Sequence, residues 1–168
     1  MRRGFSKLAV LITLWCCCVP LIGTAASNDA QTAVGAVLDT LHQAAAEADG
    51  DLYFSLFAAD AVFLGTDPSE RWSIEQFKAF AQPYFSKGQG WAYLPGERHV
   101  DILPGGKTAQ FDELLFNAAY GVCRGTGVLV LTPRGWRISQ YSLSIPIPND
   151  LAKDIVARIR EFDAEAVE

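Results

Sequence analysis

The chain has 168 residues, of which 50% are hydrophobic and 20% are charged, and it is long enough to bury one substantial core. It carries 14 Lys and Arg residues against 19 Asp and Glu residues, for a formal net charge of −5. An acidic protein repels phosphate backbones, so nucleic acid is not an expected partner.

The first 26 residues have the three-part pattern of a secretory signal peptide. Arg2, Arg3 and Lys7 form a positive start, residues 8–22 are an apolar run, and residues 23–26 are small. Such a run is too short and wrongly flanked for a retained membrane span. We therefore expect a signal peptide over 1–26, a periplasmic or secreted location, and no stable membrane anchor after signal removal.

Removal of this segment changes the charge and the cysteine count. The mature chain keeps 11 basic and 19 acidic residues, for a net charge of −8. Cys16–Cys18 are removed with the signal peptide. A lipidated cysteine in this segment is the alternative, but a small residue should precede the modified cysteine and Trp15 occupies that position. Cys123 is then the one remaining cysteine, so no intramolecular disulfide is expected. Its place in a strand-like run favours a buried thiol over a nucleophile.

The first half of the mature chain predicts a helix, a short helix, a strand and a third helix. Apolar residues recur at intervals of three and four from Val34 to Ala48, and Asp49–Asp51 interrupts that helix. A short apolar helix is expected to end at residues 60–61, before a β-prone run at residues 62–64. Ser73, with Gln76 three residues later, predicts a capping box at the start of the third helix.

The second half predicts an antiparallel sheet and a terminal helix. The expected strands are residues 91–100, where Pro95–Gly96 indicates an edge segment or a bulge, and residues 108–116, 122–131 and 136–145. Past Pro148 an amphipathic helix is expected, with these residues on one side: Leu151, Ile155, Ile159 and Phe162.

The hairpin around residues 132–135 sets which side chains share a face. Pairing Thr132 with Gly135 puts Gly127 opposite Gln140, so Gly125 and Gly127 leave a hollow beside Trp136 and Gln140. The opposite face then carries the mixed set Arg124, Thr126, Val128, Arg137, Ser139 and Tyr141, which suits solvent or a subunit partner. An error of one residue in register would exchange the two faces.

Two stretches resemble SnoaL-like domains of the nuclear transport factor 2-like superfamily. The first is Leu56–Phe63, followed by Gly65–Pro68 and Glu70; the second is Tyr120–Leu129, followed by Trp136–Ile138 and Pro146–Asp150. The resemblance covers residues 29–150. It implies an α+β fold in which a cone-shaped, curved antiparallel sheet wraps around N-terminal helices. It further implies a single domain over 27–168 with a C-terminal helix, and a two-fold homodimer. This superfold hosts enzymes, binding proteins and subunits alike.

Asp112, Glu113 and Arg124 form the strongest charged group, because short loops bring their strands together. We expect Arg124 to lie opposite one of the two carboxylates. A buried charge in a sheet needs such a partner. The pair is then either a buttress that fixes register, which we favour, or part of a catalytic site.

Asp67 and His42 are the other catalytic candidates. Asp67 precedes Pro68, and this resembles the catalytic aspartate of ketosteroid isomerase-type enzymes, although the spacing is longer. The alternative, which we favour, is a turn that Asp67 and Glu70 stabilise. His42 lies at the edge of the apolar face of the first helix and is either a structural hydrogen-bonding group or a proton carrier.

The expected pocket is aromatic. Its predicted lining is Phe54, Phe63, Phe80, Trp91, Tyr93, Trp136 and Gln140, with His42 as a polar group. Such a pocket favours the binding of a small apolar or amphipathic molecule. A cofactor-free acid/base enzyme of isomerase, hydrolase or cyclase type is the alternative, and a dimeric assembly protein without catalysis is a third. With two histidines in the chain, a three-histidine metal site is excluded, and we expect no metal and no cofactor.

Overall fold

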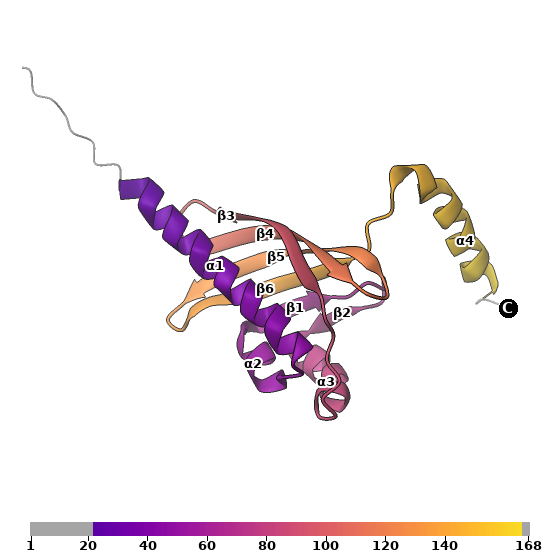
Figure 1. Ribbon diagram of the computed structural model, residues 1–168, viewed down its shortest axis with the longest axis horizontal. Coiled ribbons are helices and arrows are strands. Elements are labelled where there is room, and N and C mark those ends of the chain that lie inside the picture. The colour runs from indigo at the N-terminus through magenta and orange to yellow at the C-terminus, as the bar shows by residue number, and fades with distance from the viewer. Residues whose placement is uncertain (1–21, 166–168) are drawn as a thin grey trace, which may run out of the picture.

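The computed structural model describes residues 22–165, so most of the expected signal peptide lies outside the described residues (Figure 1). Its helices are α1 (Ile22–Ala46), α2 (Gly50–Ser55), α3 (Ile74–Phe85), the 3-10 helix η1 (Asn149–Leu151) and α4 (Ala152–Glu165). Its strands are β1 (Phe57–Leu64), β2 (Arg71–Ser73), β3 (Leu94–Ile102), β4 (Thr108–Asn117), β5 (Gly121–Thr132) and β6 (Gly135–Ser144). No helix among these residues is both long and apolar enough to cross a membrane.

Two helices begin at caps that the sequence predicts. Asp49 caps α2 by accepting a hydrogen bond from the backbone N–H of Leu52 at 2.9 Å. At the start of α3, Ser73 and Gln76 form the predicted capping box. Each cap satisfies backbone donors that the first helical turn leaves without partners.

The six strands form one curved, open sheet in the order β2-β1-β6-β5-β4-β3. All neighbouring pairs are antiparallel except β1 and β6, which run parallel. Helix α1 crosses one face of this sheet, and α2 and α3 lie at one end of it (Figure 1). The core forms between α1 and the strand residues that face it, including Leu38, Leu129 and Ile138, each fully buried. The predicted α+β fold is confirmed.

Strand β1 begins earlier than predicted. The short second helix ends at Ser55, and Phe57 already pairs with Ile138 of β6. The backbone N–H of Ile138 also donates to the carbonyl oxygen of Leu56 at 2.9 Å. Pairing with a distant strand therefore overrides the local helical pattern of residues 56–60.

A β-bulge in β6 changes the predicted faces of the hairpin. Val128 pairs with Gln140 and Leu129 pairs with Ile138, which leaves Ser139 without a partner on β5. The alternation therefore reverses after Ser139. Tyr141 faces the core and is 4% exposed, whereas Gln140 is exposed on the outer face. The predicted faces of Gln140 and Tyr141 were therefore wrong, because the prediction did not include the extra residue Ser139 of the bulge.

Helix α4 stands apart from the sheet, joined to β6 by residues 145–148 (Figure 1). The predicted apolar stripe is present but not covered, since Leu151, Ile159 and Phe162 are 52%, 50% and 70% exposed. This helix does not contribute to the core described above.

Candidate functional site

A buried carboxylate is the centre of the site. Strand β4 places Glu113 on the face of the sheet that α1 covers, where it is 1% exposed. Its Oε1 lies 2.7 Å from Nε2 of His42 on α1 and accepts a hydrogen bond from the Tyr141 hydroxyl at 3.3 Å. Its Oε2 accepts from Nε of Arg98 at 2.8 Å. Both oxygens therefore have partners, as burial of a charge requires.

Arg98 links this carboxylate to the first helix. It lies on β3 with its Cα opposite Glu113, and its Nη1 donates to Asp39 at 2.8 Å and to the carbonyl oxygen of Gly35 at 3.1 Å. Burial alone would lower the pKa of Arg98, but the hydrogen bond to Asp39 and the charge of Glu113 raise it overall. The guanidinium thus stays charged between two carboxylates and holds α1 against the sheet.

Tyr141 is the third side chain that contacts Glu113, after His42 and Arg98. Burial, followed by the charge of Glu113, raises its pKa well above the usual value of 10.0. The phenol therefore remains a neutral donor to the carboxylate. Gly125, opposite Glu113 on β5, makes this contact feasible, because an added Cβ there would meet the Tyr141 hydroxyl and Oε1 of Glu113.

Arg124 does not pair with either predicted carboxylate. Its Cα lies opposite Leu114, and its side chain is exposed on the outer face of the sheet. Asp112 is exposed on that same face, opposite Thr126. The predicted buttress exists, but Arg98 supplies its cation. The bulge predicted at Pro95–Gly96 is present, with a register shift between Pro95 and Arg98, but the pairing of Arg98 with Glu113 that follows it was not predicted.

Asp67 lies in the exposed loop between β1 and β2. Its Oδ1 accepts from the backbone N–H of Ser69 at 2.8 Å and from the Ser69 hydroxyl at 2.5 Å, and these bonds lower its pKa. Oε2 of Glu70 accepts from the backbone N–H of Asp67 at 3.2 Å. Asp67 therefore shapes the turn, as one of the two interpretations expected.

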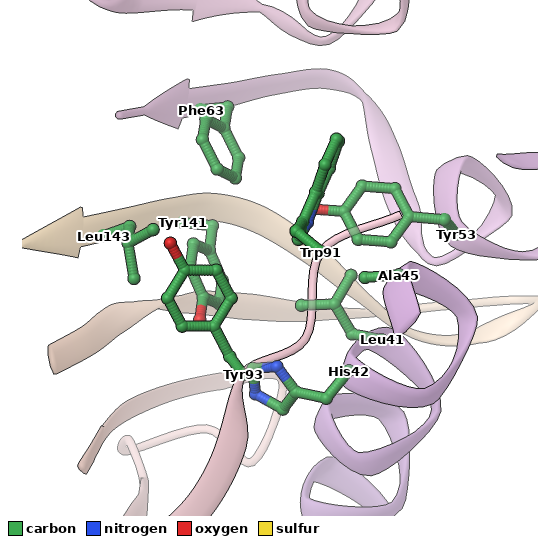
Figure 2. Close-up of a pocket in the computed structure, with 9 residues that line it drawn as sticks. All are labelled: Leu41, His42, Ala45, Tyr53, Phe63, Trp91, Tyr93, Tyr141 and Leu143. Carbon is green, nitrogen blue, oxygen red and sulfur yellow. The ribbon is translucent and has the colours of Figure 1, made fainter. Parts of the chain in front are cut away.

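Above His42 lies a small inner chamber of about 20 Å³, enough for roughly one water molecule. Figure 2 shows its lining, with His42 and Tyr93 close together on one side and Phe63 on the other. The lining residues are Leu41, His42, Ala45, Tyr53, Phe63, Trp91, Tyr93, Tyr141 and Leu143.

A larger outer cavity of about 250 Å³ adjoins this chamber, and the two share Phe63, Trp91, Tyr93 and Leu143. Its other lining residues are Gly65, Thr66, Glu70, Trp72, Phe77, Phe80 and Tyr120. Burial, with smaller effects of Cys123 and Tyr120, raises the pKa of Tyr93 to about 12. Its hydroxyl is therefore a neutral hydrogen-bonding group beside both spaces. We call the two spaces together the aromatic cavity.

The structure brings together only part of the predicted lining. Phe63, Phe80, Trp91 and Tyr93 line the aromatic cavity, as does His42. Phe54, Trp136 and Gln140 do not. Phe54 lies in a separate surface hollow, with Nζ of Lys78 5.9 Å from its ring centre, Trp136 packs in the core, and Gln140 is on the outer face.

Two further features bear on chemistry. Within residues 22–165, no three His, Cys, Asp or Glu side chains are grouped so that they could hold a metal ion. Cys123 is fully buried, and burial raises the pKa of its thiol, which is unfavourable for a nucleophile.

A family model described as the SnoaL-like domain matches residues 34–148. The chain belongs to the SnoaL-like domain family. The matched residues include α1 from residue 34 onwards, the sheet and both parts of the aromatic cavity.

Solved structures agree with this assignment. A protein described as a candidate scytalone dehydratase from Novosphingobium aromaticivorans is 10% identical, with a TM-score of 0.64 over 74% of this chain and 89% of its own. An NTF2-like protein of unknown function from Pseudomonas putida is 14% identical, with a TM-score of 0.59 over 73% and 91%. A protein of unknown function from Pectobacterium atrosepticum is 23% identical, with a TM-score of 0.58 over 71% and 92%. At these identities the likeness shows the fold. No curated protein matches the chain.

Proposed function

We propose that this SnoaL-like protein binds a small aromatic or amphipathic molecule in the aromatic cavity. The observation that carries the proposal is the composition of the cavity, in which aromatic faces surround an opening that narrows towards His42. Ligand sites are typically concave and apolar with a few placed polar groups. The volume of about 250 Å³ is just below the usual range of such sites, so we expect a small ligand of one or two rings.

The tryptophans offer a direct test. Trp72 and Trp91 line the cavity, whereas Trp136 packs in the core away from it. We expect one- and two-ring aromatic compounds to shift the indole N–H signals of Trp72 and Trp91 in a ¹H–¹⁵N NMR titration. The Trp136 signal serves as the internal control. Saturable shifts confined to Trp136, or absent from all three signals, would refute binding in the cavity.

Acid/base catalysis without a cofactor is the second candidate. Oε1 of Glu113 contacts Nε2 of His42, and the imidazole ring faces the chamber. A carboxylate orients a histidine base through such a contact. In this reaction His42 takes a proton from a carbon next to a carbonyl group of the bound ligand. Returning it to a neighbouring carbon gives an isomerisation, and loss of a hydroxyl group as water gives an elimination. A dehydratase description among the structural neighbours is in keeping with the second outcome.

Deuterium uptake separates a binding protein from such an enzyme. A ketone that binds the cavity is incubated with the protein in D2O, and exchange of its α-protons is followed by NMR. Catalysis by His42 predicts exchange that His42→Gln abolishes while binding remains. Absence of exchange above the rate without protein, for every ketone that binds, favours a binding protein.

We further propose that the protein is exported and acts in a periplasmic or secreted location. The basic start, the apolar run and the small residues of positions 1–26 support this proposal. Intact-mass analysis of protein from its native host should give a chain that starts near residue 26 or 27. A mass that includes Met1, or a lipid on Cys18, would contradict it.

A homodimer is the proposed assembly. The outer face of the sheet carries Leu94, Phe116 and Val122, which are cross-strand neighbours on β3, β4 and β5. All three are more than half exposed, and together they make an apolar row beside the polar part of that face. A second copy covers such a row through a closed two-fold contact, which avoids growth into a filament. Phe116 and its neighbours therefore extend the face that the sequence had suggested for pairing.

A further inference from the structure

We infer that the aromatic cavity selects its ligand by charge and takes an aromatic ammonium compound in preference to an aromatic carboxylate. This inference rests on the proposed function, because it names the class of molecule that the same cavity binds.

Apart from His42, which pairs with Glu113, the charged groups that line the cavity have one sign. Among the described residues that line the two spaces there is no lysine and no arginine. Glu70 is the carboxylate among them. An organic anion would therefore enter without a cationic partner and would lie near a negative charge, which disfavours binding in a partly enclosed site.

The loop between β1 and β2 fixes Glu70 in the wall of the outer cavity. The backbone N–H of Gly65 donates to the carbonyl oxygen of Glu70 at 2.9 Å, and Oε2 of Glu70 accepts from the N–H of Asp67. The carboxylate packs against Gly65, where an added Cβ would clash with Oε2. Gly65 thus lets the carboxylate lie close to the backbone in the cavity wall, which Thr66 also lines.

The rings beside Glu70 supply the second half of a cation site. Trp72 stacks on Phe80 with centroids 4.9 Å apart, and Trp72 and Phe77 are 5.5 Å apart. The negative face of an aromatic ring attracts an ammonium group, most strongly for tryptophan. The carboxylate of Glu70 and the aromatic rings that line the same cavity therefore attract the same charge.

The floor of the cavity does not offset this preference. Arg98, the cation behind His42, is shared between Glu113 and Asp39. These two carboxylates balance its positive charge, so Arg98 gives no net attraction for an anion in the chamber. The raised pKa of Tyr93, about 12, also keeps that hydroxyl neutral, so it does not repel either kind of ligand.

Three probes with one ring system and different charge test the inference by calorimetry. These are 2-naphthylmethylamine, 2-naphthalenemethanol and 2-naphthoate, measured at pH 7 with the full protein. We expect the ammonium probe to bind about tenfold more tightly than the carboxylate probe, with the neutral alcohol between them. Glu70→Gln should weaken the ammonium probe about fivefold and leave the alcohol unchanged.

Glu97→Gln is the matched control, because Glu97 is an exposed carboxylate on β3 that does not line the cavity. It should change none of the three affinities. If none of the three probes binds, the proposed function itself fails. If the alcohol binds but the carboxylate binds as tightly as the ammonium probe, or Glu70→Gln leaves the ammonium affinity unchanged, the charge preference is overturned and the cavity remains a binding site.

Discussion

His42 and Glu113 meet across the interior of the protein, with Nε2 of the histidine 2.7 Å from Oε1 of the carboxylate. The first comes from α1 and the second from β4, 71 positions later in the chain. Their contact joins the helix to the sheet and at the same time presents the imidazole ring to the chamber. Stability and function therefore depend on one group of side chains.

Arg98, the cation that pairs with Glu113, should be essential for stability. Arg98→Met removes the partner of a carboxylate that is 1% exposed, and breaking one side of a buried pair costs about 3–5 kcal/mol. We expect this loss in the free energy of unfolding measured with urea. Arg124→Met is the control on the exposed outer face and should stay within about 0.5 kcal/mol of wild type.

A double-mutant cycle with Glu113→Leu completes this test. Replacing both members of a buried pair by apolar side chains restores much of the stability that a single replacement loses. Equal stability of wild type and Arg98→Met, with a coupling energy near zero, would mean that Arg98 and Glu113 do not support the fold.

The space above Gly125 should be equally sensitive. Gly125→Ala introduces a Cβ that meets the Tyr141 hydroxyl and Oε1 of Glu113, so one of them must shift. Overpacking of this kind costs about 1–3 kcal/mol. Thr126→Val, one residue on and on the outer face, should change the free energy of unfolding by less than about 0.5 kcal/mol in the same denaturant experiment. If the two variants are equally stable, the site around Glu113 is looser than described.

Buried tyrosines should limit stability at alkaline pH. The pKa values of Tyr53, Tyr93 and Tyr141 are raised in the folded protein, in each case chiefly by burial, and that of Tyr93 reaches about 12. Above the unfolded value of 10.0 the unfolded chain binds fewer protons than the folded one. Their contribution to stability is thus complete below pH 10 and is lost as pH rises through the folded values.

We therefore expect the free energy of unfolding to fall between about pH 10 and pH 12, and the 295 nm phenolate signal to lag behind that of unfolded protein. Tyr141→Phe should reduce the slope of this loss. A flat stability profile across this range, with all tyrosines ionising as they do in urea, would contradict the burial of these phenols.

The apolar row on the outer face predicts the assembly. Phe116→Asp places a charge in the row with Leu94 and Val122 and should convert a dimer to a monomer in light scattering at micromolar concentration. Leu131→Asp is the control, since Leu131 is 44% exposed but lies at the far end of β5. A wild-type protein that is already monomeric would refute the proposed pairing.

Local patterns in the sequence predict most of the fold. The caps at Asp49 and Ser73 and the bulge at Pro95–Gly96 are set by neighbouring residues, so they can be inferred from a few positions. The two stretches that resemble SnoaL-like domains then predict how these elements are arranged, as a curved sheet around the N-terminal helices. What local pattern misses is the parallel pairing that begins at Phe57, because it depends on β6, some 80 residues away.

The site is harder to predict because it depends on register. The unpaired Ser139 moves Tyr141 into the core and Gln140 out of it, and no turn residue marks that bulge in the sequence. The register of β3 likewise decides that Arg98, and not Arg124, meets Glu113. His42 and Phe63 were found because helix and strand periodicity directs them inwards, whereas Trp91 and Tyr93 line the cavity from the segment that precedes β3.

The central claim, that the aromatic cavity is a binding site, is tested most directly by filling it. Leu143 lines both parts of the cavity and is partly exposed, so Leu143→Phe reduces the open volume without changing charge. Calorimetry with 2-naphthalenemethanol should show saturable binding to wild type and at least tenfold weaker binding to Leu143→Phe, with the thermal unfolding midpoint little changed. Equal affinity for the two proteins would contradict the account, because the ligand would then bind elsewhere.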